Sequence, residues 1–233
     1  MAKLKKKKKY TTERVLDNLN ETAYKAENFF ERHSKPIIGI LGVLALLAIG
    51  YFVYLKTVLE PKSQNALTEM VQADDYFMQD SMNLALKGSP GSFQGYEQII
   101  ENYGNTKGGN LARYKAGIAY YKLGDYASAV SSLEKFKTDD NILEAQRLGM
   151  IGNALNDGQK KEQALTYYVK AAEATDYEVL KTIYYKKAGE LAIQLGKNQE
   201  ALKYFQILTD TYPNIGPDIE KYVERLKYAT GVN

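Results

Sequence analysis

Residues 112–136 read ARYKAGIAYYKLGDYASAVSSLEKF, and residues 185–213 read YKKAGELAIQLGKNQEALKYFQILTDTYP. Both stretches carry apolar residues at helical spacing on either side of a glycine, Gly124 or Gly196. Glycine at such a place can take the left-handed backbone conformation that ends a helix. Each stretch therefore predicts two amphipathic helices joined by a short turn.

Small residues recur in register with these turns. Three glycines are each followed, twelve residues later, by an alanine. The pairs are Gly117 with Ala129, Gly152 with Ala164, and Gly189 with Ala201, at periods of 35 and then 37 residues. Small residues in both helices let two antiparallel backbones approach closely, and larger side chains fill the space beside them. We expect the side chains that fill this space to be Tyr126, Leu133, Phe205 and Leu208. The middle copy departs from the pattern, because Gly158 is shifted by one position.

With three copies in register, residues 110–213 resemble the tetratricopeptide repeat family, a helix-turn-helix repeat of about 34 residues. The resemblance implies an all-α solenoid that holds other proteins. Residues 107–216 would form three repeats, and residues 217–233 a capping helix. One face of that helix would carry Ile219, Tyr222, Val223, Leu226 and Ala229. Residues 60–106 predict a long helix over 62–87, a break at 88–92 and a second helix over 93–103, which together resemble a degenerate repeat.

A membrane anchor is predicted near the N-terminus, within residues 36–59. Residues 37–55 read IIGILGVLALLAIGYFVYL, nineteen residues without a charge, which is long enough for a helix to cross a bilayer. A cleaved secretory signal is the alternative, but its apolar core is usually shorter, and no A-x-A cleavage site follows. The membrane-facing side chains would include Ile37, Leu41, Leu44, Leu47, Phe52 and Leu55.

The orientation of the anchor follows from its flanking charge. Ten Lys and Arg residues precede the anchor, whereas only Lys56 and Lys62 lie in the twenty positions after Leu55. Because basic flanks stay in the cytosol, the N-terminus is predicted to be cytoplasmic and the C-terminal domain periplasmic, on a bacterial inner membrane. Residues 1–35 would form a basic tail, with an amphipathic helix between Thr11 and Phe30.

Composition removes most catalytic and metal chemistry. The chain has no cysteine and one histidine, His33, so thiolate sites and His-paired metal clusters are excluded. We expect no enzyme activity, no cofactor and no metal, and the mildly acidic C-terminal region argues against nucleic acid. Twenty tyrosines are expected to pack between helices, with their hydroxyls in water.

The candidate partner-binding residues lie on the first helix of each repeat, which lines the inner wall of such an array. The predicted set is Tyr114, Ile118, Tyr121, Lys122, Asn153, Asn156, Lys186, Glu190 and Ile193. The alternative for each position is a solvated surface, or packing against residues 62–103.

The whole arrangement of basic tail, single anchor and repeat array resembles the YfgM-like family of ancillary subunits of the bacterial Sec translocon. That resemblance implies contacts with translocon subunits, with a membrane-anchored periplasmic prolyl isomerase chaperone and with secreted polypeptides, beside membrane lipid. Two alternatives stay open. One is an envelope scaffold for cell-wall synthesis, outer-membrane assembly or secretion, and the other is a regulatory subunit of a partner enzyme.

Overall fold

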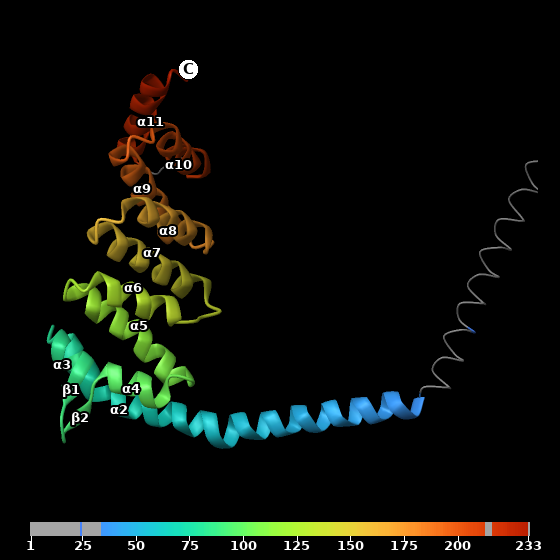
Figure 1. The fold of residues 1–233 in the computed structure, drawn as a ribbon. Coiled ribbons are helices and arrows are strands. Elements are labelled where there is room, and N and C mark those ends of the chain that lie inside the picture. The colour runs from blue at the N-terminus through green and yellow to red at the C-terminus, as the bar shows by residue number, and fades with distance from the viewer. Residues whose placement is uncertain (1–23, 25–33, 213–215, 233) are drawn as a thin grey trace, which may run out of the picture. The chain divides into compact units, whose positions relative to one another are not determined.

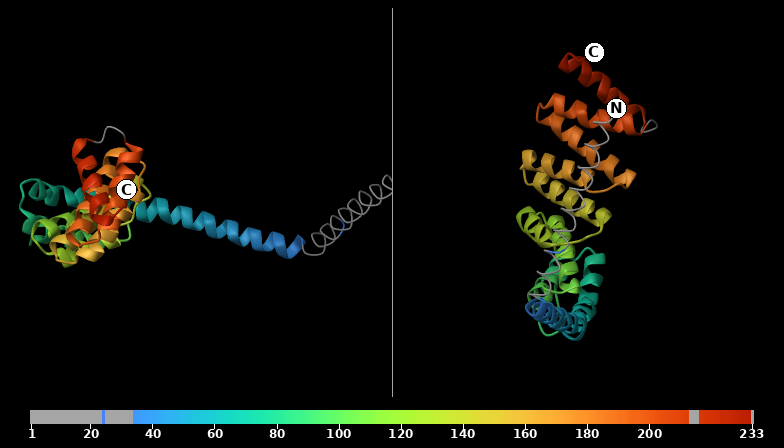
Figure 2. Two further views of the ribbon diagram at one scale, coloured as in Figure 1. Left: turned by 90° about the horizontal axis from the view of Figure 1, so that it is seen from above. Right: turned by 90° about the vertical axis from the view of Figure 1, so that its right-hand side faces the viewer.

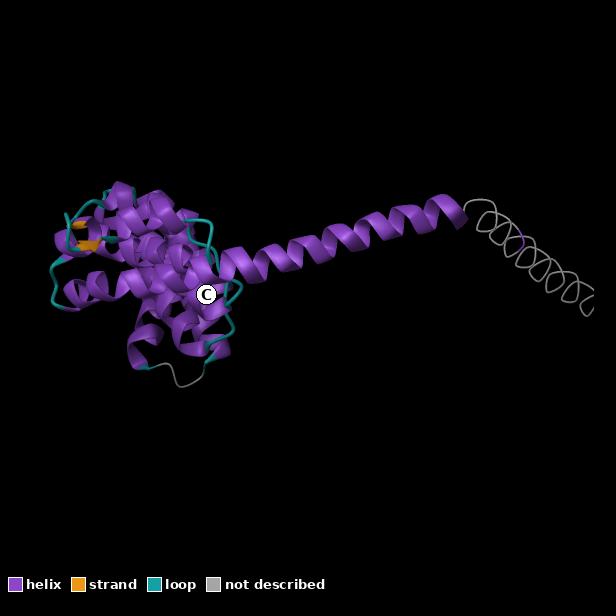
Figure 3. Ribbon diagram, turned by 90° about the horizontal axis from the view of Figure 1, so that it is seen from below, coloured by secondary structure: helices purple, strands orange, loops and turns teal. Residues whose placement is uncertain are grey.

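The computed structural model describes residues 24, 34–212 and 216–232, and the chain divides into two compact units, residues 1–58 and 59–233. Nearly all of the described chain is helical, as Figure 3 shows by colour. The predicted basic tail and the amphipathic helix at 11–30 lie almost entirely outside the described residues.

The apolar segment of the first unit is helical. It belongs to a helix that runs from Ser34 to Met78 and has a window with a mean hydropathy of 2.5, none of which is buried. Length and composition make this helix able to cross a membrane. Of the predicted membrane-facing residues, Leu41, Leu44, Leu47 and Phe52 are all more than half exposed.

The second unit begins with helices that replace the predicted long helix. After η1 (Leu55–Leu59), α2 (Glu60–Met78) ends where Asp80 takes a positive φ of 60°. The short helix α3 (Met82–Lys87) follows. The expected single helix over 62–87 is therefore wrong, because the left-handed backbone at Asp80 stops the helical hydrogen-bond pattern.

A small hairpin interrupts the helices at the predicted break. Strand β1 (Gly88–Ser89) pairs antiparallel with β2 (Phe93–Gln94), and α4 (Tyr96–Tyr103) starts only after it. A Cβ atom at Gly88 would lie 2.4 Å from the Gly95 nitrogen, so the close approach of the two backbone segments requires glycine at position 88. The helix predicted to begin at residue 93 is thus shortened by this strand pair.

Three helical hairpins follow and stack in order, as Figures 1 and 2 show. Their bounds are α5 (Lys107–Lys122) with α6 (Tyr126–Lys135), α7 (Asn141–Asp157) with α8 (Lys161–Glu173), and α9 (Glu178–Gln194) with α10 (Asn198–Thr211). One continuous core runs through them from Leu133 to Leu226. A second core joins Ala66, Met70 and Ile99 to α5. The three hairpins agree with the predicted repeat pattern.

The recurring glycines make the close contacts that their spacing predicts. A Cβ atom would lie 2.5 Å from Leu133 Cγ at Gly117, 2.7 Å from Tyr168 Cδ1 at Gly152, and 2.6 Å from Phe205 Cε2 at Gly189. The contacted residue always lies four positions after the buried alanine of the pair. The glycine therefore makes room for the large side chain of the second helix, which confirms the predicted packing.

The hairpin turns use left-handed backbone at one position each. Gly124 has φ 78° and Gly196 has φ 73°, as predicted. In the middle hairpin that conformation falls on Gln159, with φ 64°, because Gly158 lies one residue too early. The shift seen in the sequence is thus a real difference in the backbone.

Helix α11 (Pro217–Thr230) closes the far end of the array. Ile219 and Leu226 are buried, and the Tyr222 ring stacks on Phe205 with centroids 4.7 Å apart. Ala229, expected on the same face, is exposed instead. The helix therefore seals the core with its first three turns.

Candidate partner-binding site

The first helices of the three hairpins form one side of the array. Helix α5 contacts α7, and α7 contacts α9, more closely than the second helices α6, α8 and α10 contact one another. The array therefore curves toward its first helices. We call the surface that α5, α7 and α9 present on this side the inner face.

Polar side chains link neighbouring helices across the inner face. The Tyr121 hydroxyl on α5 donates to Asp157 Oδ2 on α7 over 2.7 Å. Asn153 Oδ1 on α7 accepts from Lys187 Nζ on α9 over 2.7 Å and from the Tyr168 hydroxyl over 3.0 Å. Lys187 Nζ also lies 5.4 Å from the centroid of the Tyr168 ring. These contacts fix the relative positions of the three first helices.

Burial and hydrogen bonding shift the pKa values of these groups. Its hydrogen bond to Asp157 and partial burial raise the pKa of Tyr121 to about 12. Burial raises the pKa of Tyr184 to about 12. Burial lowers the pKa of Lys187, while Asp157 and Glu190 oppose that change. Tyr121 is therefore a neutral donor that holds the Asp157 carboxylate in place.

Several of the predicted residues belong to the packing of the inner face. The Tyr114 ring lies 5.0 Å from the Phe136 ring and packs on the main core. Ile193 is also packed on that core. Asn156 Nδ2 donates to Asp157 Oδ1 over 3.3 Å, and its own Oδ1 is buried without a partner in the described chain. Tyr114 and Ile193 are therefore part of the packing of the array, and Asn156 is held beside Asp157.

The other predicted residues differ in how exposed their side chains are. Ile118 and Glu190 are partly exposed, and Lys186 is exposed. Lys122 instead donates to Asp80 over 2.8 Å and lies above the Phe77 ring, so it is directed toward α2 and the turn after it. Ile118, Lys186 and Glu190 therefore stay candidates for contact with a partner.

Sequence reasoning missed a set of exposed aliphatic side chains on α7 and α9, which we call the apolar row. Val179 and Ile183 on α9 are 53% and 41% exposed, and Ile142 at the start of α7 is 40% exposed. A spacing of four residues places Val179, Ile183 and Lys187 on one face of α9. That four-residue spacing could have predicted Val179 and Ile183 from the sequence. The alignment of the glycines instead predicted Lys186, one position before Lys187.

Residues 60–103 leave the inner faces of α7 and α9 to other contacts. Helices α2, α3 and α4 pack mainly on α5 and on one another. Their shared core includes Met70, Tyr96 and Ala116. Self-occupation of the inner face by this segment, the alternative drawn from the sequence, is thus not seen over α7 and α9.

Across 34–212 and 216–232, no group of three His, Cys, Asp or Glu side chains is placed to hold a metal ion. The inner face combines exposed aliphatic side chains with fixed amide, hydroxyl and ammonium groups. That mixture is typical of surfaces that bind protein segments.

Known proteins share this fold. The tetratricopeptide repeat profile matches residues 111–140 and 185–214. Two solved structures, titled "Crystal structure of MamA" and "Crystal structure of MamA protein", are each 17% identical to the chain, with TM-scores of 0.53 and 0.55. They cover 69% and 72% of this chain and 85% and 83% of their own. No curated protein matches the sequence. The chain therefore carries tetratricopeptide repeats within a nearly all-helical fold, an arrangement that scaffolds for protein–protein interaction use.

Proposed function

We propose that this protein is a membrane-tethered scaffold that holds segments of other proteins on the inner face of its repeat array. The observation that carries the proposal is the exposure of Ile142, Val179 and Ile183, the apolar row, on the same two helices that carry the linked polar groups of Asn153 and Lys187. Burying aliphatic side chains against a partner is favourable, at roughly 25 cal/mol per Å² of apolar area. The polar groups beside the row would set the register of the bound segment.

The proposed mechanism is local concentration, with no bond made or broken. An anchor at residues 36–59 confines the array to the membrane surface, so a weakly held partner on the same membrane meets it repeatedly. The partly exposed Ile118 and Glu190 and the exposed Lys186 enlarge the contact area around the apolar row. A scaffold of this kind needs no cofactor.

In its finer form, the proposal places the array in the bacterial periplasm beside the Sec translocon. The support is architectural: a basic N-terminal tail, one helix apolar enough to cross a membrane, and a repeat array after it. The partners would be translocon subunits, a membrane-anchored prolyl isomerase chaperone and emerging secreted polypeptides. An envelope scaffold for another machine would share the inner face and differ only in the partner.

Affinity purification of the full chain from mildly solubilised membranes tests this proposal. The double variant Val179→Asp/Ile183→Asp should lose its partner, because two carboxylates would be buried without ion pairs. Leu67→Asp/Val71→Asp is the matched control, since these residues are 37% and 54% exposed at the same spacing on α2. Recovery of Sec components with the control but not with the inner-face variant supports the finer form. Equal recovery with both variants contradicts the role of the inner face.

A further inference from the structure

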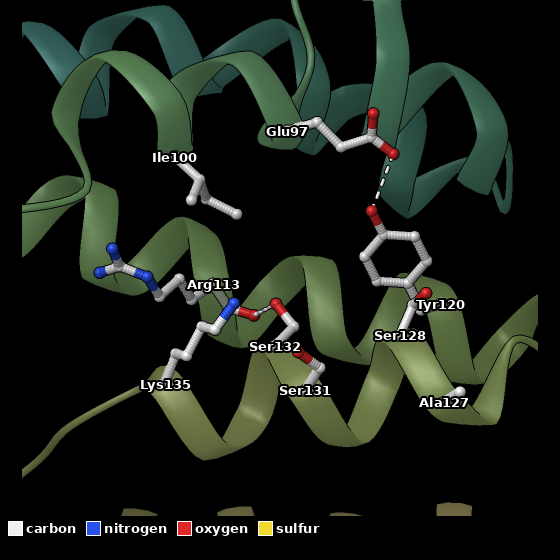
Figure 4. Close-up of a pocket in the computed structure, with 9 residues that line it drawn as sticks. All are labelled: Glu97, Ile100, Arg113, Tyr120, Ala127, Ser128, Ser131, Ser132 and Lys135. Atoms are coloured by element: carbon white, nitrogen blue, oxygen red, sulfur yellow. Dashed lines mark hydrogen bonds between the residues drawn. The ribbon is translucent and has the colours of Figure 1, made fainter.

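A groove of a different character lies along α4, α5 and α6, away from the inner-face contacts. One hollow of about 470 Å³ is lined by Glu97, Ile100, Arg113, Tyr120, Ala127, Ser128, Ser131, Ser132 and Lys135, which Figure 4 draws. A second hollow of about 730 Å³ adjoins it and shares Arg113 and Lys135 with the first. We call the two together the α4–α6 groove.

Cations outnumber carboxylates in this groove. The second hollow is lined by Lys107, Arg113, Lys135 and Lys137. None of the four forms an ion pair with a residue in the described part of the chain. Among the described residues of 59–233, six of the 20 Lys and Arg form ion pairs, and Lys115 is one of them, with Asp74 at 2.6 Å. The concentration of four cations in one groove, and not their lack of ion pairs, therefore distinguishes it.

The two carboxylates that line the groove are already engaged. Glu97 Oε1 accepts from the Tyr120 hydroxyl over 2.8 Å, and Glu134 Oε1 accepts from the Tyr167 hydroxyl over 2.9 Å. Figure 4 shows the Glu97–Tyr120 pair at one end of the first hollow, with Arg113 and Lys135 toward the other. Counted by formal charge, the four cations and these two carboxylates leave the groove with an excess of two positive charges.

The background charge makes this groove more distinctive. Residues 59–233 contain 20 Lys and Arg against 23 Asp and Glu, a net charge of −3. A cationic groove on an otherwise acidic unit focuses attraction on anionic partners at that one place. A membrane of anionic lipid would instead be repelled by most of the surrounding surface.

Backbone contacts hold the cationic end ready before any partner arrives. Arg113 Nη1 donates to the Gly104 carbonyl oxygen, and its buried Nε has no partner in the described chain. The Asn110 side chain donates to the Lys137 carbonyl over 2.7 Å and accepts from the Lys137 nitrogen over 3.1 Å. These neutral groups therefore fix the Arg113 side chain and the backbone at Lys137, which lowers the entropic cost of binding there.

We propose that the α4–α6 groove binds an extended acidic segment of a partner protein. Carboxylates of the segment would pair with Arg113, Lys135 and Lys137, and such charge-assisted hydrogen bonds are the strong ones. The partly exposed Ser128 and exposed Ser131 line the path of the chain, and Ile100 provides an apolar wall. This site is separate from the inner face, so either site can fail its test without the other.

Peptide binding by the full chain in zwitterionic nanodiscs tests the proposal. The probe is a fluorescent Glu-Gly repeat peptide, and its Gln-Gly counterpart reports binding that does not depend on charge. Lys135→Gln/Lys137→Gln should weaken binding of the acidic peptide by about tenfold or more, since two charged contacts are lost. Both lysines are exposed, so the fold should not suffer. Lys87→Gln/Lys203→Gln removes the same charge elsewhere and should leave the affinity within about twofold.

Four results would overturn the proposal. The first two are equal affinity of the two double variants for the acidic peptide, and binding of the Gln-Gly peptide as tight as that of the Glu-Gly peptide. The third is complete displacement of the acidic peptide by an equal concentration of inorganic phosphate. The fourth is that Lys135→Gln/Lys137→Gln weakens attachment to anionic vesicles without any change in peptide binding. Arg113→Lys should reduce affinity, because the planar fork of arginine is lost while the charge is kept. Unchanged affinity in that variant would remove Arg113 from the site.

Discussion

Gln159 takes the left-handed backbone conformation that glycine takes in the other two hairpin turns. Its φ of 64° matches the 78° and 73° of Gly124 and Gly196. A residue with a Cβ atom pays about 1–2 kcal/mol for this conformation. The middle turn therefore carries a local cost that its two neighbours avoid.

Replacing Gln159 by glycine should stabilise the protein by about 1 kcal/mol, because the steric cost of the left-handed backbone disappears. Thermal unfolding followed by circular dichroism measures the change. Gln163→Gly, at an exposed site in α8, is the control and should destabilise by about 0.5–1 kcal/mol. A lower melting temperature for Gln159→Gly would contradict the strain argument.

The glycine of the third hairpin should tolerate no added methyl group. A Cβ atom at Gly189 would lie 2.6 Å from Phe205 Cε2 and Cζ, so Gly189→Ala should cost about 1–3 kcal/mol of unfolding free energy. Adding Phe205→Leu to this variant should recover part of the loss, since the ring is removed. A double-mutant cycle by chemical denaturation checks the coupling, and simple additivity would show that the two residues do not clash.

Sequence alone could predict these small-residue contacts because each follows from a fixed spacing within one hairpin. The hydrogen bond of Lys187 to Asn153 could not be predicted in the same way. Its role depends on Asn153, which lies on a different hairpin, and a rotation of α9 by one residue decides whether Lys186 or Lys187 faces it. Contacts between repeats need the angle between helices, which spacing does not encode.

Between elements, tyrosine hydroxyls repeatedly join one helix to a carboxylate on another. The hydroxyls were expected in water, but five donate to carboxylates over 2.7–2.9 Å. The pairs are Tyr96 with Asp74, Tyr103 with Glu69, Tyr120 with Glu97, Tyr121 with Asp157, and Tyr167 with Glu134. These hydrogen bonds join neighbouring helices in addition to the packing of their apolar cores.

The Tyr121–Asp157 link predicts a loss of stability at alkaline pH. The pKa of Tyr121 rises from 10.0 to about 12 in the folded chain, so its contribution is complete below about pH 10. That contribution disappears as the pH rises toward about 12, because the neutral hydroxyl that donates to Asp157 is lost. Tyr121→Phe should therefore lose less stability than the parent over this range.

Urea unfolding at several pH values measures this difference. Tyr228→Phe is the control, because Tyr228 is 94% exposed and donates to no carboxylate in the described chain. It should follow the parent at every pH. An unchanged pH dependence in Tyr121→Phe would show that the hydroxyl contributes nothing to the link between α5 and α7.

Elements before the repeats were the hardest to foresee from the sequence. Residues 62–87 have continuous helical periodicity, yet the chain turns at Asp80 and again at the hairpin of Gly88. Aspartate is only a weak signal for positive φ, whereas glycine is a strong one. The break at 88–92 could therefore be predicted and the break at 80 could not.

At the scale of the molecule, the repeat array is closed at both ends by elements outside the three hairpins. Helices α2 and α4 cover α5 on one side, and α11 covers α10 on the other. Exposed ends of a helical solenoid need such polar-faced caps for solubility. The caps pack on α5 and α10, and Ile142, Val179 and Ile183 on α7 and α9 stay exposed.

The proposed orientation predicts which side of the membrane bears the array. Protease added to right-side-out vesicles should digest residues 59–233, because they would lie outside the cytosol. The same protease should spare a tag fused at the N-terminus until detergent opens the vesicles. Protection of the array in sealed vesicles would show the opposite orientation and would contradict the proposed role beside the translocon.

Photocrosslinking in living cells tests the central claim most directly. A photoreactive amino acid placed at Ile183 or Ile118 on the inner face should yield adducts with a defined partner polypeptide. The same residue at Lys203, exposed on α10, should yield none of those adducts. Abundant adducts from Lys203 together with none from Ile183 and Ile118 would contradict a scaffold that holds its partners on the inner face.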